Sequence, residues 1–239
     1  MLILNKPITK IWDSRFAYAI GLFTADGCLS SDRRHLDFTS KDMAQVRNFK
    51  NCLHLTNKIT KKTRDKEKIK KYYHIQFGSV RFYRFLESIV LSQRKSRRLK
   101  NLNIPTKFFP DFLRGLFDGD GTFDKFWHPE SRFPQIRVKF ISGSPIFLKW
   151  LQKKINHRLK TRGYITNKGS VENLEYAKED SFKLLKLMYY SDNNVYLFRK
   201  FKKIKPYLAD VAKLVEARDL ESREETRVGS TPTVRTNLF

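Results

Sequence analysis

The stretch Gly-Leu-Phe-Thr-Ala-Asp-Gly at residues 21–27 returns 94 positions later as Gly-Leu-Phe-Asp-Gly-Asp-Gly at residues 115–121. Five of the seven positions are identical. Each copy ends an apolar run of helical character, over 16–23 and over 108–117. Each also closes with Asp-Gly, a pair typical of a helix that stops in a left-handed turn. The sequence therefore predicts an internal repeat built around two similar helices.

Matching segments follow the two copies. Apolar and polar residues alternate over 36–39 and over 136–140, which predicts strands. Further strands are expected at 73–77 and 175–176, and further helices at 46–53, 82–89, 146–155 and 182–188. Both halves therefore read helix, hairpin, helix, hairpin, helix, and the expected fold class is α+β with two αββαββα repeats.

Four segments are expected along the chain. They are a first repeat over 1–93, a basic exposed linker over 94–107, a second repeat over 108–207 and a C-terminal tail over 208–239. The linker combines basic residues with two asparagines and Pro105, a composition typical of exposed connections.

The C-terminal tail departs from the repeat pattern. Residues 209–239 carry five basic and six acidic side chains, so the positive charge of the chain belongs to the repeats. Back-translation of residues 228–233 permits a transfer RNA T-arm, and the flanking residues permit the other arms of a leucine transfer RNA in frame. We interpret the tail as read-through into such a gene. The alternative is an ordinary C-terminal helix over about 208–225, and the codons of the gene distinguish the two.

Composition limits the classes of function. The 239 residues include 49 Lys and Arg against 24 Asp and Glu, which gives a net charge of +25 and makes nucleic acid the leading partner class. Two cysteines, Cys28 and Cys52, are too few for a disulfide framework or a Cys-rich zinc site. No apolar run has the length of a secretory signal or a membrane span. We expect a cytoplasmic protein of a prokaryotic or organellar interior.

The repeat resembles the LAGLIDADG homing endonucleases in their single-chain, two-motif form. The match spans residues 16 to about 207, with Ala19 to Gly27 and Leu113 to Gly121 in the nine motif positions. The resemblance implies that the two motif helices pack at a pseudo-twofold axis. It also implies an antiparallel sheet in each repeat, the two forming a saddle that binds double-stranded DNA at a long asymmetric target. The expected form is a monomer encoded by an intron or another mobile element.

The motif residues are consistent with metal-dependent hydrolysis. Gly21 and Gly115 lie in mid-helix, where glycine costs about 1 kcal/mol relative to alanine, and close packing of two helices gives a reason for them. Asp26 and Asp120 end those helices, where the helix dipole disfavours negative charge, so a pair of them favours a bound cation. Oxygen ligands of this kind suit Mg²⁺. We expect Mg²⁺-assisted phosphodiester hydrolysis, with each aspartate serving one DNA strand as metal ligand and catalytic residue.

The resemblance also implies a catalytic basic residue near the scissile phosphate. Lys41 matches that position in the first repeat. Gly143 stands at the corresponding place in the second repeat, so Lys125 or Lys139 substitutes there or the two half-sites are chemically unequal. Thr24 and Asp118 differ at the other acidic position of the motif, which indicates a structural role for Asp118.

The outward faces of the predicted hairpins carry side chains suited to bases and phosphates. The expected DNA-binding residues are Arg33, Arg34, His35, Lys61, Lys62, Arg64, His74, Gln76, Lys125, Arg132, Gln135, Arg137, Lys139, Arg162 and Lys168.

The sequence therefore predicts a site-specific double-strand DNA endonuclease that uses Mg²⁺. Two alternatives on the same scaffold remain open at this point. One is a maturase that binds intron RNA, and the other is a catalytically inactive DNA-binding protein. The presence of both Asp26 and Asp120 favours the nuclease over either alternative.

Overall fold

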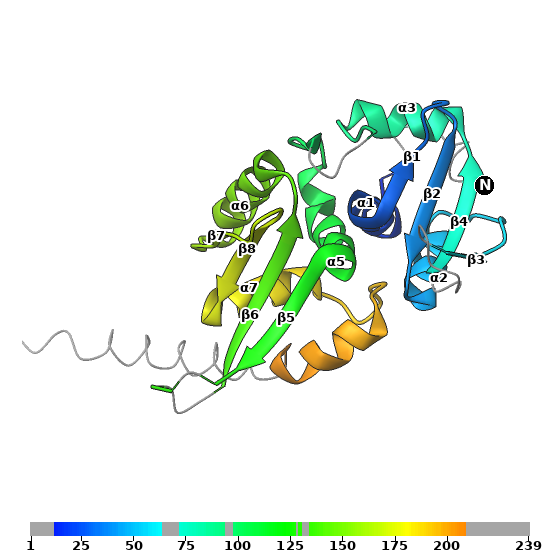
Figure 1. The fold of residues 1–239 in the computed structure, drawn as a ribbon. Coiled ribbons are helices and arrows are strands. Elements are labelled where there is room, and N and C mark those ends of the chain that lie inside the picture. Colours follow the sequence, from blue (N-terminus) through cyan, green and yellow to red (C-terminus); the bar gives the residue numbers. More distant parts are fainter. Residues whose placement is uncertain (1–11, 64–71, 94–97, 128, 131–133, 209–239) are drawn as a thin grey trace, which may run out of the picture.

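The computed structural model describes residues 12–63, 72–93, 98–127, 129–130 and 134–208 (Figure 1). The tail over 209–239 and the expected DNA contacts of Arg64 and Arg132 lie outside these residues. Within them, no helix is both long and apolar enough to cross a membrane.

The two halves of the chain have the same order of elements. The first half contains α1 (Ser14–Asp26), β1 (Gly27–Leu29), β2 (His35–Ser40), α2 (Met43–Cys52), β3 (Thr60–Lys62), β4 (Tyr72–Gly78) and α3 (Val80–Ser88). The second contains η3 (Thr106–Phe108), α5 (Phe109–Asp120), β5 (Gly121–Phe126), β6 (Gln135–Ser142), α6 (Pro145–Leu159), β7 (Tyr164–Asn167), β8 (Glu172–Ala177) and α7 (Lys178–Met188). A further helix covers residues 198–208.

Each half forms one four-stranded antiparallel sheet. The strand orders are β1-β2-β4-β3 and β5-β6-β8-β7. When the strands of each half are counted along the chain, both sheets have the same order. Figure 1 shows α1 and α5 side by side at the centre, with one sheet on each side of the pair. The predicted α+β fold with two αββαββα repeats is confirmed.

Alternation along the strands divides each sheet into two faces. Leu36 and Phe38 of β2 are fully buried, whereas their neighbours His35, Asp37 and Thr39 are only partly buried. In β6 the buried positions are Ile136, Val138 and Phe140, and their neighbours are half-buried and, apart from Ile141, polar. The apolar face of each sheet therefore packs on the helices, and the polar face is open.

The Asp-Gly ends of the motif helices differ from expectation. Gly27 has φ −79° and ψ 155°, and Gly121 has φ −88° and ψ 154°, so both are extended and the predicted left-handed turn is wrong. Glycine is required there for a different reason. A Cβ on either residue would lie 2.3 Å from the ring of the phenylalanine one turn earlier, Phe23 or Phe117. Each helix therefore runs directly into the first strand of its sheet.

The connection between the repeats also differs from expectation. Leu99, Leu102 and Ile104 are buried, whereas Lys100, Asn101 and Asn103 between them are exposed, so the prediction of an exposed linker holds only in part. Residues 94–97 of the linker lie outside the described residues. The three apolar side chains join the core cluster that runs through both repeats, and the connection is therefore packed rather than loosely attached.

Candidate functional site

The two motif helices cross with backbone touching backbone. A Cβ on Gly21 would lie 2.1 Å from the carbonyl oxygen of Phe112, and a Cβ on Gly115 would lie 2.0 Å from that of Tyr18. Tyr18 and Phe112 each precede their glycine by three positions, so the contact is reciprocal, as a twofold axis requires. The structure thus confirms that Gly21 and Gly115 allow close helix packing.

This crossing brings the two motif acids to the same end of the helix pair. Asp26 and Asp120 are the last residues of α1 and α5. A Cβ on Gly119, the residue before Asp120, would lie 2.3 Å from Cβ of Ala25 and 3.6 Å from Oδ2 of Asp26. Asp26 is half-buried and Asp120 is exposed. The two helix ends that carry the motif acids therefore lie side by side at one surface.

A buried glutamine contacts the first motif acid. Gln45 lies in the first turns of α2, is 2% exposed, and donates from Nε2 to Oδ2 of Asp26 at 2.9 Å. Its Oε1 accepts a hydrogen bond from Oγ of Ser40 at 3.0 Å. Sequence reasoning missed Gln45, because a single glutamine in an amphipathic helix carries no signal that it turns inward.

A lysine from the C-terminal helix contacts the end of the second motif helix. Lys200 Nζ donates to the carbonyl oxygens of Phe117 at 2.6 Å and Gly121 at 2.7 Å. These carbonyls flank Asp120 in the chain. Burial lowers the pKa of Lys200 to about 8, and the carboxylates of Asp118, Asp120 and Asp26 oppose that shift. The ammonium thus offsets the negative end of the α5 dipole beside both motif acids.

The sequence analysis did not identify Lys200 at this end of α5. It named Lys125 or Lys139 as the basic residue of the second repeat, or else two chemically unequal half-sites. Lys139 forms an ion pair with Asp124 at 2.7 Å. Lys125 lies directly opposite the buried Ile136, so its side chain is on the helix-covered face of the sheet. Lys200 is 80 positions after Asp120, and no pattern in the sequence links the two.

Lys41, expected near the scissile phosphate, lies at the end of β2. Its Nζ is 5.4 Å from the centre of the Tyr72 ring, a cation–π contact. The residue is exposed and adjoins Ser40, whose hydroxyl contacts Gln45. Gln45 therefore contacts Asp26 directly, whereas the contact given for Lys41 is with Tyr72.

The open face of the first sheet has an acid at its centre. Asp37 accepts from Lys62 Nζ at 3.0 Å and from His74 Nδ1 at 2.9 Å, and the Thr39 hydroxyl also donates to it. Burial raises the pKa of Asp37, but the hydrogen bonds from Thr39, Lys62 and His74 outweigh it and hold the pKa below its ordinary value. Gln76, directly opposite Asp37 in β4, is exposed on the same face.

The remaining expected contacts of the first half lie around this sheet. Arg33 forms an ion pair with Glu87 at 3.1 Å and keeps 70% of its side chain exposed. His35 contacts Asp32, and the neighbouring Arg34 is exposed. Lys61 lies 5.5 Å over the ring of Tyr73, which packs against the core. The Lys61 side chain therefore lies on the helix-covered face of the sheet, whereas that of Lys62 lies on the open face.

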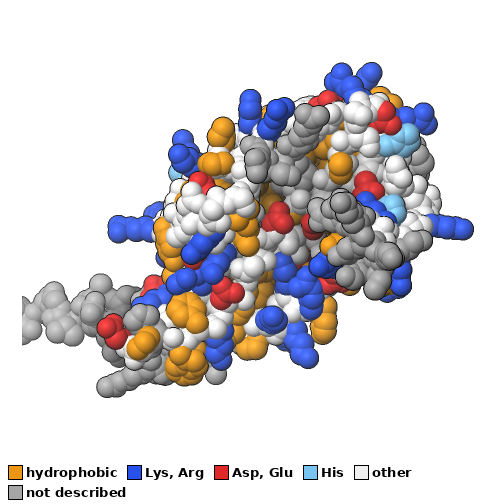
Figure 2. All heavy atoms as spheres, viewed as in Figure 1, with side chains coloured by type: hydrophobic (Ala, Val, Ile, Leu, Met, Phe, Trp, Pro, Cys, Tyr) orange, Lys and Arg blue, Asp and Glu red, His pale blue; other side chains and the backbone are white. Residues whose placement is uncertain are grey.

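The open face of the second sheet is organised in a similar way. Arg137 forms an ion pair with the buried Glu175 at 3.2 Å and lies 4.7 Å over the Phe126 ring. Glu175 also accepts from the Thr166 hydroxyl at 2.7 Å. Gln135 lies on the same face of β6 as Arg137 and Lys139, whereas Arg162 and Lys168 are exposed at the two ends of β7. Figure 2 shows Lys and Arg side chains spread over both halves of the molecule.

The first repeat matches a known family. Residues 13–90, which include α1 and the whole first sheet, match the family model of a LAGLIDADG-like domain. The second repeat carries the same motif and the same strand order. The first repeat thus matches the LAGLIDADG-like family model, and the second repeat shares its motif and its fold.

Solved structures of low sequence identity share this LAGLIDADG fold. The homing endonuclease I-WcaI bound to its DNA recognition sequence has a TM-score of 0.56 and 13% identity, over 82% of this chain and 90% of that one. The meganuclease I-AabMI bound to uncleaved DNA has a TM-score of 0.55 and 14% identity, over 87% and 92%. Full-length DUF199/WhiA from Thermatoga maritima has a TM-score of 0.51 and 15% identity, over 94% and 72%. No curated protein matches the chain in sequence.

The donor set at the two helix ends fits a hard divalent cation with few protein ligands. The described residues contain no cluster of three or more His, Cys, Asp or Glu side chains able to hold a metal. Asp26 and Asp120 supply two carboxylates at one surface. Mg²⁺ commonly binds through one or two carboxylates and takes its remaining ligands from water and substrate phosphate. Two acids at an open surface therefore fit Mg²⁺ when DNA is present.

Asp118, the other acid of the second LAGLIDADG motif, is fully buried and away from solvent. Its Oδ2 accepts from the Tyr18 hydroxyl at 2.6 Å and from the backbone N–H of Leu197 at 2.7 Å. It therefore joins α1, α5 and the start of the C-terminal helix. Burial raises its pKa to about 6, although the Tyr18 hydroxyl and Lys200 favour the charged form. The structure supports the expected structural role.

Asp118→Asn is expected to change how the stability of the protein depends on pH. Because the folded pKa is near 6 and the usual value is 3.8, the folded state holds an extra proton between these pH values. Wild type therefore loses stability as pH rises through 6, by roughly 3 kcal/mol in total, whereas the amide does not titrate. Urea denaturation of both proteins at pH 4 and pH 7 measures this loss. A pH-independent difference between them would contradict the assignment.

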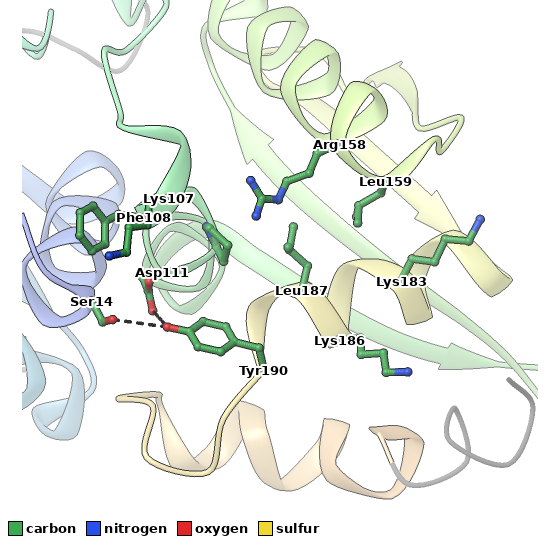
Figure 3. A pocket seen from close by; sticks show the side chains of 11 residues that line it. Ser14, Lys107, Phe108, Asp111, Arg158, Leu159, Lys183, Lys186, Leu187 and Tyr190 are labelled. Atoms are coloured by element: carbon green, nitrogen blue, oxygen red, sulfur yellow. Dashed lines mark hydrogen bonds between the residues drawn. The ribbon is translucent and has the colours of Figure 1, made fainter. Parts of the chain in front are cut away.

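A pocket lies at the other end of α5. Its volume is about 630 Å³, and it lies between the start of α5, the end of α6 and α7 (Figure 3). Tyr190 donates to Asp111 at 3.0 Å at its edge, and Asp111 also accepts from the buried Arg114. The pocket lies at the first turn of α5 and Asp120 is its last residue, and the twelve residues of this helix span about 18 Å. The pocket is therefore separate from the site of the two motif acids.

Proposed function

We propose that this chain is a site-specific double-strand DNA endonuclease that depends on Mg²⁺. The observation that carries the proposal is the reciprocal glycine crossing, which delivers Asp26 and Asp120 to one surface between two sheets with polar, cation-bearing open faces. The DNA complexes of I-WcaI and I-AabMI support DNA as the partner, because they share the fold.

The roles of the residues follow from their places. Asp26 and Asp120 would hold the divalent cation, which supplies Lewis-acid chemistry that activates water and stabilises charge on the phosphate. Gln45 orients Asp26 through its amide. Lys200 keeps a positive charge beside Asp120, where a developing negative charge on phosphate is stabilised.

The open faces of the sheets would bind the duplex on both sides of this site. Their cations are held by acids of the same chain, as in Lys62 with Asp37 and Arg137 with Glu175. Such pairing fixes the cations in place before DNA arrives, which favours contacts to base edges over loose phosphate contacts. We propose a monomer acting on a long asymmetric target, encoded by an intron or another mobile element, and working in a reducing cellular interior.

The proposal is tested by exposing the full chain to a randomised duplex library with Mg²⁺ and sequencing the cut ends. We expect double-strand cuts at one long sequence, inhibition by a chelator and binding that weakens steeply with salt. Binding of duplex without cutting would instead indicate an inactive DNA-binding protein. Preferential binding of structured intron RNA would indicate a maturase.

A further inference from the structure

The hydrogen bonds around Gln45 fix which way its amide faces. Ser40 Oγ accepts from the backbone N–H of Asp42 at 3.1 Å and gives its own proton to Gln45 Oε1 at 3.0 Å. The oxygen end of the amide is therefore committed to Ser40, and Nε2 is directed at Oδ2 of Asp26. The amide is buried, so water does not compete for this contact.

The second repeat has the same loop but a different side chain. Gly27 pairs with Phe38 and Gly121 pairs with Phe140, so position 38 corresponds to 140 and Gln45 corresponds to Phe147. Ser142 Oγ accepts from the backbone N–H of Ser144 at 3.1 Å, as Ser40 does from Asp42. The loop is thus preserved, but Phe147 is buried against Trp150 and has no polar hydrogen to donate.

The two motif acids therefore have chemically different supports. Asp26 is half-buried and receives a neutral amide donor from its own repeat. Asp120 is exposed, and its neighbouring carbonyls bind the ammonium of Lys200. A neutral donor restrains a carboxylate without changing the net charge of the site, whereas an ammonium adds a positive charge to it.

We infer that Gln45 is a positioning residue for one half-site only: its amide holds Asp26 in its metal-binding orientation, so that the two DNA strands are cut at separately controlled rates. The inference rests on the proposed endonuclease function. Loss of such an outer-shell partner of a metal ligand typically costs about 10- to 100-fold in metal affinity or activity.

The test is Gln45→Met, which keeps a buried unbranched side chain of similar volume and removes the donor. A target duplex with a different fluorophore on each 5′ end is cut under single-turnover conditions over a range of Mg²⁺ concentrations. We expect one strand to slow by about 10- to 100-fold and to require more Mg²⁺, while the other keeps its wild-type rate. On a supercoiled plasmid, nicked circles should accumulate.

Two further variants keep the inference falsifiable. Phe147→Met is the matched control, because it makes the same kind of packing change at the corresponding position without touching a donor, and it should slow neither strand selectively. Ser40→Ala leaves Gln45 in place but frees its amide, and it should slow the same strand as Gln45→Met by a smaller factor. Ser40 is half-buried, so this variant tests the inference even if Gln45→Met does not fold.

The outcomes separate the inference from the proposed function. Equal slowing of both strands by Gln45→Met, or unchanged rates and Mg²⁺ requirement in a folded Gln45→Met protein, would overturn the inference and leave the endonuclease intact. A wild-type chain that binds duplex and never cuts it overturns the proposed function, and the inference with it. Slowing of one strand at unchanged DNA affinity supports both.

Discussion

Gly21→Ala and Gly115→Ala are each expected to lower the free energy of unfolding by at least about 3 kcal/mol, although alanine is the better helix former. The added Cβ would lie 2.0 to 2.1 Å from a backbone carbonyl oxygen of the other helix. A side chain can rotate away from a clash, but the backbone of a packed helix cannot. Urea or thermal denaturation monitored by circular dichroism measures the loss.

A matched pair of variants shows whether the crossing is the cause. A Cβ on Gly119 would clash with the Cβ of Ala25 at 2.3 Å, and its next neighbour, Oδ2 of Asp26, lies at an ordinary 3.6 Å. Gly119→Ala should therefore destabilise alone and recover when combined with Ala25→Gly. No such swap is available at Gly21 or Gly115, where the obstacle is backbone. Gly78→Ala, with nothing nearer than 3.5 Å, should have a small effect. Wild-type stability in Gly21→Ala would show that the helices do not cross as described.

Asp26→Asn and Asp120→Asn are expected to reduce DNA cleavage by on the order of 10³-fold or more. A bound metal ion supplies several kcal/mol of charge stabilisation, and each 1.36 kcal/mol corresponds to a factor of ten in rate. An amide is a weaker ligand of Mg²⁺ than a carboxylate. Single-turnover cleavage of the selected target measures the loss.

DNA affinity provides the control for these two variants. Each removes a negative charge from a surface facing a polyanion, so binding at fixed salt should be unchanged or tighter. Loss of cutting together with loss of binding would indicate misfolding rather than a lost ligand. Cutting that persists in both variants would contradict the metal site formed by the two motif acids.

Much of the architecture was predictable because the repeat is visible in the chain itself. Two copies of one motif, followed by the same order of apolar alternation and helical spacing, correctly predicted two αββαββα repeats. Mid-helix glycines correctly predicted a close helix crossing, because glycine is unfavourable there without a packing reason. These features are local in sequence or repeat within it.

Errors arose where one residue type serves two physical purposes. The glycine after each motif aspartate was assigned to a left-handed turn, but Gly27 and Gly121 are extended and make room for Phe23 and Phe117. Apolar residues in the linker were overlooked beside its positive charge, and they are buried. Lys61 and Lys125 were assigned to the open faces of the sheets together with neighbouring polar residues, but both lie on the helix-covered faces.

The sequence by itself determined the repeat, the fold class and the two acids at the helix ends, because each is written in neighbouring residues or in their recurrence. Only the tertiary structure decided which groups support those acids. Gln45 reaches Asp26 across 19 positions, and Lys200 reaches the end of α5 from a helix at the far end of the described chain. Such contacts depend on how helices and loops distant in sequence pack together, and single side chains carry no periodic signal of where packing places them.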